Sequence, residues 1–308
     1  MQEMTFIYGP VPSRRLGISL GISPIPKKTC NYSCIYCQLG RTDHLTNQRK
    51  MFFLLEEILM EFDEINQHNL SYDVITIVGE GEPTLFLGLG ELIPALQKKT
   101  EKPVAVITNG ALLYDRGVQA ELCAADIVLA SLDAFDEASF KRINRPHKSL
   151  TFKQVLTGLV DFSIRYSGQL WLEMMLMEGI NDDNTSFEKY AALLETVTYD
   201  RLYLNTPVRP PAESDVKTIN PEKMRQVVDR LGGTAVDMLH SEGFHSEITD
   251  HYVAILSIIK RHPVNQFEIL SFLETRECDD PETVLNDLKE DRQVDAISYK
   301  GCVTFRLK

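Results

Sequence analysis

A chain of 308 residues, of which 44% are hydrophobic and 25% charged, has the composition of a globular protein, with room for a catalytic domain of roughly 200–250 residues and a small second domain. Its formal net charge of -12 disfavours an extended, nonspecific grip on nucleic acid, because neutralising phosphates takes lysine and arginine. No apolar run reaches the roughly 18 residues of a membrane span, and the N-terminal segment has neither a basic start nor a long apolar stretch. We therefore expect a cytoplasmic protein with no signal peptide and no membrane partner.

The first two thirds of the chain alternates short apolar runs with amphipathic stretches. Nearly continuous apolar runs are typical of parallel strands covered on both faces. Six such runs occur, at 18–25, 74–78, 104–108, 127–132, 170–177 and 202–205. The amphipathic stretches predict helices, among them 52–66, 152–165 and 187–197. Alternating strand–helix units predict an α/β fold with a parallel sheet or partial barrel, whose chemistry lies at the C-terminal ends of the strands.

After the last predicted strand, the segment 205–211 is expected to be an exit loop that could still line the site. A helix over 221–231 is predicted next, because Asn220 is a suitable N-cap and Pro221 suits the first helical position.

The pattern changes near residue 247, and we predict two domains, 1–246 and 247–308. Asn265 and Glu268 form a possible capping pair at the start of a helix, and Asp280 precedes a proline that would open another. Three helices are predicted, over 248–259, 265–273 and 281–289, followed by two strands around Lys300 and Gly301. Three helices followed by a hairpin is the element order of a winged helix.

The charge of this C-terminal segment disfavours binding to DNA. From residue 248 to 308 there are eight Lys or Arg and eleven Asp or Glu, a net charge of 8 - 11 = -3. The third helix, which would read DNA in a winged helix, is itself acidic, with Glu282, Asp287, Glu290 and Asp291. We therefore predict a packing or protein-interaction module.

Three of the six cysteines, Cys30, Cys34 and Cys37, are spaced as C-x3-C-x2-C just after the first predicted strand. Thiolates are the preferred ligands of iron–sulfur clusters, and a loop of this length can wrap three corners of one [4Fe-4S] cubane. The fourth iron then lacks a protein ligand and can chelate the amino and carboxylate groups of S-adenosylmethionine (SAM). An electron from the cluster then breaks a sulfur–carbon bond, leaving methionine and a 5'-deoxyadenosyl radical.

Two simpler interpretations of these cysteines stay open. A structural zinc site would need a fourth ligand, for which His44 is the nearby candidate. The spacing could also be a coincidence among buried structural cysteines. The scattered Cys123, Cys278 and Cys302 are expected to be isolated, partly buried thiols that form no second cluster.

The cysteine motif and the sequence GEGEPT at 79–84 resemble the radical SAM superfamily, a likeness that covers roughly residues 10 to 210. The segments GPVPSRRLG at 9–17 and CQLG at 37–40 more specifically resemble bacterial relatives of the wyosine-type tRNA-modifying radical SAM enzymes. The resemblance implies a partial (βα)6 radical SAM barrel with a small C-terminal winged-helix-like domain. It also implies a [4Fe-4S] cluster and SAM as cofactors, and an electron donor such as a flavodoxin or a ferredoxin.

The same resemblance implies roles for the residues nearest the cysteines. Tyr36 would lie beside the adenine of SAM. The backbone carbonyls of Gly81, Glu82 and Pro83 would receive the SAM ammonium group, and glycine permits that close backbone approach.

Three further residues at strand ends would complete the SAM site. Asn109 ends the third strand, and Ser131 and Asp133 end the fourth and could bind the ribose hydroxyls. Local alternatives stay open, because Asn109-Gly110 is also a turn signal and Asp133 could cap a helix that starts near Phe135.

Charged residues in or after the strands are candidate catalytic or substrate-binding groups. Glu173 lies in an apolar strand, where a charge is costly unless it is paired or functional. It could point into the barrel and meet SAM or substrate, or form a salt bridge at a strand end. Arg209 could bind an anionic group, or it could be an ordinary loop arginine. Arg14 and Arg15 could together bind a phosphate or carboxylate group of the substrate, or they could form surface ion pairs.

These features predict a radical SAM enzyme with an unassigned substrate. The substrate could be RNA, by analogy with the wyosine-type enzymes, or a small molecule, protein or peptide. The net charge disfavours tRNA, and no cysteine precedes Cys30, whereas the archaeal wyosine enzymes use additional N-terminal cysteines for a second cluster. The alternative is a non-catalytic iron–sulfur regulator that senses redox state and binds DNA, against which the acidic third helix and the SAM-type motifs weigh.

Overall fold

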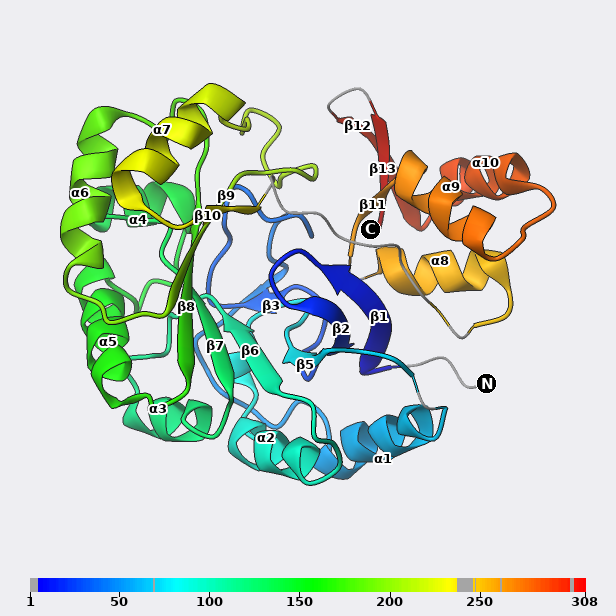
Figure 1. Cartoon of the computed structure of the whole chain (residues 1–308), viewed down its shortest axis with the longest axis horizontal. Coiled ribbons are helices and arrows are strands. Elements are labelled where there is room, and N and C mark those ends of the chain that lie inside the picture. Colours follow the sequence, from blue (N-terminus) through cyan, green and yellow to red (C-terminus); the bar gives the residue numbers. More distant parts are fainter. Residues whose placement is uncertain (1–4, 69, 237–245, 247, 261, 300–301) are drawn as a thin grey trace.

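The computed structural model describes residues 5–68, 70–236, 246, 248–260, 262–299 and 302–308. Its larger part is an eight-stranded sheet in the order β1-β2-β5-β6-β7-β8-β9-β10, curved into an open barrel (Figure 1). From β2 to β10 all neighbouring strands are parallel, as the continuous apolar runs predict. These strands are Gly17–Ile22 (β2), Val74–Ile77 (β5), Val104–Thr108 (β6), Ile127–Ser131 (β7), Gln169–Met175 (β8), Arg201–Asn205 (β9) and Thr234–Ala235 (β10). The six predicted strands are confirmed, with small differences at their ends. A short parallel pair, Thr29–Cys30 (β3) and His44–Leu45 (β4), lies outside the sheet.

β1, Ile7–Ser13, is an antiparallel edge strand that the sequence prediction missed. Two prolines in this segment argue against a strand, because proline lacks the N–H that a central strand needs. At a sheet edge proline is tolerated. The turn after β1 extends across the inner face of the sheet, because Arg15 forms an ion pair with Glu173 of β8. The β1–β2 hairpin therefore closes over part of the open barrel.

Helices connect the parallel strands and cover the outer face of the sheet (Figure 1). They are Leu55–Asn66 (α1), Leu89–Gln97 (α2), Arg116–Leu122 (α3), Glu137–Ile143 (α4), Phe152–Arg165 (α5), Asn184–Leu194 (α6) and Pro221–Leu231 (α7), with a 3-10 turn at Pro83–Leu85 (η1).

The helices predicted over 152–165 and 221–231 are confirmed, and Asn220 caps the second through Lys223 N at 2.8 Å. The helix predicted over 187–197 starts earlier, at Asn184, because the side chain of Asp183 caps it. The prediction named no helix at α2, α3 or α4. They are short, and α2 contains a proline.

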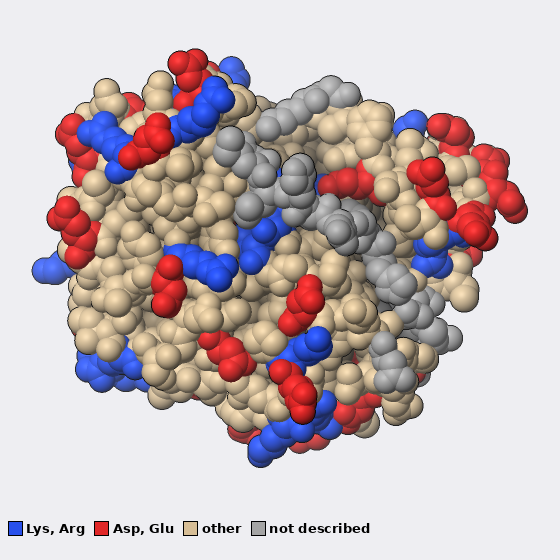
Figure 2. Space-filling model, in the orientation of Figure 1, with Lys and Arg blue, Asp and Glu red and all other residues tan. Residues whose placement is uncertain are grey.

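The C-terminal unit contains the three predicted helices and the predicted hairpin. Its elements are His251–Ile259 (α8), Val264–Asn265 (β11), Gln266–Thr275 (α9), Pro281–Glu290 (α10), Val294–Tyr299 (β12) and Cys302–Leu307 (β13), with a sheet in the order β11-β13-β12. The predicted capping pair is confirmed, since Glu268 N donates to Asn265 Oδ1 at 3.0 Å and Asn265 N donates to Glu268 Oε2 at 2.8 Å. Residue 247 and the hairpin tip at 300–301 lie outside the described residues. Acidic side chains gather over this unit (Figure 2).

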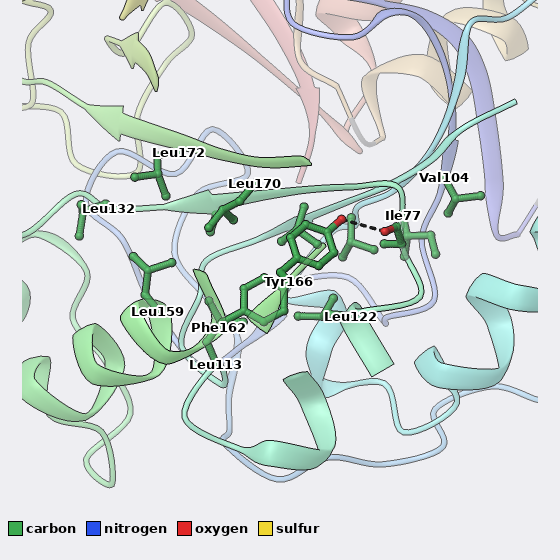
Figure 3. Close-up of a cluster of buried hydrophobic side chains, with 14 of the residues drawn as sticks. Ile77, Val104, Leu113, Leu122, Leu132, Leu159, Phe162, Tyr166, Leu170 and Leu172 are labelled. Carbon is green, nitrogen blue, oxygen red and sulfur yellow. Dashed lines mark hydrogen bonds between the residues drawn. The ribbon is translucent and has the colours of Figure 1, made fainter. Parts of the chain in front are cut away.

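Separate apolar clusters lie on the two faces of the large sheet. On the outer face, Phe162 stacks on Tyr166 with ring centroids 4.8 Å apart, and the Tyr166 hydroxyl donates to the carbonyl of Ala125 at 2.8 Å (Figure 3). On the inner face, Val74, Ile127 and other residues near the N-terminal ends of their strands form a second cluster. This packing leaves the C-terminal ends of the strands for polar groups. Among the described helices, none has the length and apolar character needed to cross a membrane.

Candidate functional site

The loop that carries the cysteines runs from β3 over the C-terminal ends of the barrel strands. Backbone hydrogen bonds fix it to the C-terminal end of α4. Ser33 N donates to Asn144 O and Ile35 N donates to Ile143 O, each at 3.0 Å. The cysteines are therefore presented by a loop with a defined backbone position.

Cys30, Cys34 and Cys37 line a single cavity of about 310 Å³, which we call the cysteine cavity. It collects most of the residues that the sequence singled out: Tyr36, Gly81, Glu82, Asn109, Ser131, Glu173 and Arg209. Pro83 and Asp133 lie outside its lining.

The donor set of this cavity suits an iron–sulfur cluster. The three thiols are free of disulfides, and burial raises the pKa of each one, so their thiolates need a positive partner such as iron. Asn109 Nδ2 and Asn144 Nδ2 each lie 3.5 Å from a cysteine sulfur, and such N–H donors tune clusters. No three His, Cys, Asp or Glu side chains among the described residues are grouped closely enough to hold one metal ion. A [4Fe-4S] cubane is larger than a single ion, since each thiolate binds a different iron atom.

Gly81 occupies a position where the backbone of the cysteine loop leaves no room for a side chain. A Cβ built on Gly81 would lie 1.8 Å from the carbonyl oxygen of Thr29, the residue before Cys30. The same carbonyl accepts a hydrogen bond from Glu82 N at 3.0 Å. The loop after β5 and the start of the cysteine loop are thus joined by direct backbone contact.

The carboxylate of Glu82 is buried and fully engaged by the protein. Oε1 accepts from the hydroxyls of Thr84 and Thr108 at 2.6 Å and from Thr84 N at 3.1 Å, and Oε2 accepts from Asn109 N at 2.8 Å. Burial raises the pKa of Glu82, and these donors partly offset the rise. The side chain therefore joins the loops after β5 and β6, and the residue also lines the cysteine cavity.

Replacing Glu82 by alanine should lower the free energy of unfolding by roughly 3 kcal/mol or more, since buried donors without partners cost about 1–3 kcal/mol each. Urea denaturation of the purified protein measures this. Glu101, which is exposed, is the matched control, and Glu101→Ala should change stability by less than about 0.5 kcal/mol. Equal effects of the two substitutions would contradict the structural role of Glu82.

A model of the radical SAM superfamily matches residues 25–190, which include the cysteine loop and the strand ends that face it. The chain belongs to the radical SAM superfamily.

It is 33% identical to a UPF0026 protein of Methanocaldococcus jannaschii, over 98% of this chain and 96% of that one. It is 39% identical to a Brachyspira hyodysenteriae protein named GTPase Obg over 71% of this chain, which spans 32% of that protein. A solved radical SAM methyltransferase from Sphaerobacter thermophilus has the same fold, with a TM-score of 0.52, 16% identity, and coverage of 71% of this chain and 67% of that one.

Asp133 lies outside the lining of the cysteine cavity, and its carboxylate is hydrogen-bonded to protein groups. Its carboxylate accepts from the Tyr36 hydroxyl, from Asn144 Nδ2 at 3.0 Å and from Met175 N at 3.0 Å. Its predicted bond to a ribose hydroxyl thus competes with three protein donors. The alternative role as a helix cap is wrong, because Asp136 caps α4. Asp133 instead holds Tyr36 against the cavity.

Asn109 and Ser131 both line the cysteine cavity. The Asn109 side chain is fixed at both ends, since Oδ1 accepts from Ala111 N at 2.9 Å and Nδ2 donates to Asn31 Oδ1 at 2.7 Å. The turn interpretation and the site interpretation are therefore compatible for Asn109. A direct contact of either residue with SAM stays a prediction.

The ion pair that the sequence offered as one alternative for Glu173 is present, while a contact of Glu173 with SAM or substrate stays a prediction. Glu173 lines the cysteine cavity, and it is also paired with Arg15 and accepts from Asn205 Nδ2 at 2.8 Å. Arg209 is not an exposed loop arginine, since its side chain is 12% exposed and pairs with Glu268 of the C-terminal unit.

Sequence reasoning missed two residues that hold the site together. Asn144 contacts the sulfur of Cys34 from 110 positions away, and Asn31, which directly follows Cys30, accepts from Asn109, 78 positions away. No local pattern distinguishes them from ordinary loop asparagines. Cys123 is exposed, and Cys278 and Cys302 are half-buried and, like all the cysteines, free of disulfides.

Proposed function

We propose that this chain binds a [4Fe-4S] cluster through Cys30, Cys34 and Cys37 and binds SAM in the cysteine cavity, where it cleaves SAM reductively. The observation that carries the proposal is the cavity itself, which three cysteines line together with the loop at 79–82 and polar residues at the ends of β6, β7 and β8. When bound, the cluster and SAM would supply a 5'-deoxyadenosyl radical, which the protein would direct at a substrate. An electron donor such as a flavodoxin or a ferredoxin would be the partner.

In this proposal the described residues position and shield the cofactors. The three thiolates hold three corners of the cluster, and the side-chain amides of Asn109 and Asn144 stabilise negative charge on the sulfurs. Gly81 lets the loop after β5 approach the backbone of Thr29 closely. The backbone carbonyls at 81–83 would receive the SAM ammonium group. Tyr36, held by Asp133, forms part of the wall beside the last cysteine.

Anaerobic reconstitution should give about four irons per chain, the content of one cubane. Adding SAM to the reduced protein should change its electron paramagnetic resonance spectrum, because an iron without a protein ligand is open to SAM. Iron analysis and spectra with and without SAM measure both results. A protein that holds zinc and no iron would contradict the proposal.

We further propose that residues 247–308 form a winged-helix-like domain that packs on residues 1–246. The element order and the sheet β11-β13-β12 support the winged helix. Packing on the barrel is supported by the ion pair of Arg209 with Glu268 and by the hydrogen bond from Arg306 Nη1 to Gln38 O at 3.1 Å, next to the last cysteine.

The full chain should not bind duplex DNA with submicromolar affinity at physiological salt. The helix that would enter the groove is α10, whose carboxylates would face phosphate (Figure 2). Each such charge repels the backbone and releases no counterions, so the usual electrostatic gain is absent. Fluorescence anisotropy with labelled DNA measures this, and tight, salt-dependent binding would favour the iron–sulfur regulator.

A further inference from the structure

A second cavity of about 220 Å³ adjoins the cysteine cavity. Nine residues line both cavities, Arg15, Asn205 and Arg209 among them. Its walls come from the turn between β1 and β2, the loop after β9, and His262 and Glu268 of the C-terminal unit. We call it the arginine cavity, because Arg14, Arg15 and Arg209 all line it.

The charged groups of the arginine cavity leave an excess of positive charge. Glu268 is the one carboxylate among its described lining residues, and both of its oxygens accept from Arg209, at 2.8 and 3.0 Å. Arg15 is paired with Glu173, which lines the neighbouring cavity, but its Nε is buried without a hydrogen-bond partner. Within the described part of the chain, Arg14 has no ion pair.

The charges of all three guanidinium groups disfavour protonation of His262, which lines the same cavity. His262 accepts from Arg209 Nη2 at 3.0 Å through Nε2. Burial first, and then the charges of Arg209, Arg15 and Arg14, hold the pKa of His262 well below its usual range, so the imidazole adds no charge. Burial also lowers the pKa of Arg15 to about 10.

These three arginines gather in a chain whose overall charge is -12. A guanidinium group with unused donors in a partly dry cavity is matched best by a planar or tetrahedral oxyanion, which it can bind through two parallel hydrogen bonds. A cavity of this size accommodates one such group with a few carbon atoms, not a nucleic-acid strand.

We propose that the arginine cavity binds the carboxylate or phosphate group of a small-molecule substrate. As a substrate site it rests on the proposed function, because the shared wall would direct the rest of the molecule towards the cysteine cavity. As an anion site it stands on the geometry alone. The C-terminal unit then has a defined part in binding, since His262 and Glu268 set the position of Arg209.

Isothermal titration calorimetry on the full chain, before and after cluster reconstitution and without SAM, tests the anion site. The probes are succinate for a carboxylate and glycerol 3-phosphate for a phosphate, with succinamide and glycerol as neutral counterparts. One of the two anions should bind saturably at one site per chain, and the neutral molecules should not bind. Arg14→Gln should weaken binding about ten-fold or more, since hydrogen bonds to charged groups are among the stronger ones, whereas Arg14→Lys should keep part of the affinity.

Arg225, an exposed arginine on α7, provides the matched control, and Arg225→Gln should bind the anion as the wild type does. The proposal is overturned if neither anion binds, if Arg14→Gln binds normally, or if Arg225→Gln loses as much affinity. Binding of tRNA but of neither small anion also overturns it. A chain that binds the anion but never holds iron refutes the proposed function alone, and a chain that cleaves SAM but binds neither anion refutes the anion site alone.

Discussion

Replacing any one of Cys30, Cys34 or Cys37 by alanine should remove most of the bound iron and reduce SAM cleavage to background. All three cysteines line the same cavity, and three thiolates bind three of the four irons, so a site with two cysteines would hold the cluster poorly. Iron analysis and absorbance of the reconstituted variants measure the loss.

The matched control is Cys123→Ala, which removes an exposed thiol at the end of α3. It should retain full iron content and wild-type cleavage. A variant of the three clustered cysteines that still holds about four irons would contradict the assignment of its thiol as a ligand.

Gly81→Ala should destabilise the protein by about 3 kcal/mol and strongly reduce cluster assembly. The added Cβ would lie 1.8 Å from Thr29 O and 2.8 Å from Thr29 C, so backbone rather than a flexible side chain must move. Overpacking costs about 1–3 kcal/mol, and contact with backbone places this case at the upper end. Because Thr29 precedes Cys30, the displacement reaches the first cluster ligand.

Gly117→Ala serves as the control for this prediction. Gly117 lies in the first turn of α3, where the nearest atom to a new Cβ is a carboxylate oxygen of Asp115 at 3.1 Å. That contact can relax, and alanine favours helix, so stability should stay within about 1 kcal/mol. Urea unfolding and iron analysis of both variants test the prediction. A Gly81→Ala protein with wild-type stability and iron content would show that the close approach of Gly81 to Thr29 is not required.

The sequence predicted those parts of the fold that depend on local patterns. Buried parallel strands such as β6 and β7 appear as continuous apolar runs, and the capping pair of α9 lies within four residues. The edge strand β1 was missed because its prolines contradict ordinary strand preference, although an edge tolerates them. The cysteine spacing is likewise local and was sufficient to predict the centre of the site.

The partners of the charged and polar site residues could not be predicted, because they depend on contacts between remote segments. Arg15 and Glu173 are 158 positions apart, and Tyr36 and Asp133 are 97 apart. The sequence left open whether Arg209 binds an anionic group or is an ordinary loop arginine. In the structure it pairs with Glu268, 59 positions away in the C-terminal unit. Such pairings follow from how the barrel and the C-terminal unit pack together.

The formation of 5'-deoxyadenosine tests the central claim most directly. Reconstituted protein, reduced by a low-potential reductant under anaerobic conditions and incubated with SAM, should release 5'-deoxyadenosine and methionine slowly even without substrate. The product should be absent without reductant and in the Cys34→Ala variant. An intact four-iron protein that forms no 5'-deoxyadenosine under these conditions would contradict the enzyme assignment and favour a non-catalytic iron–sulfur regulator.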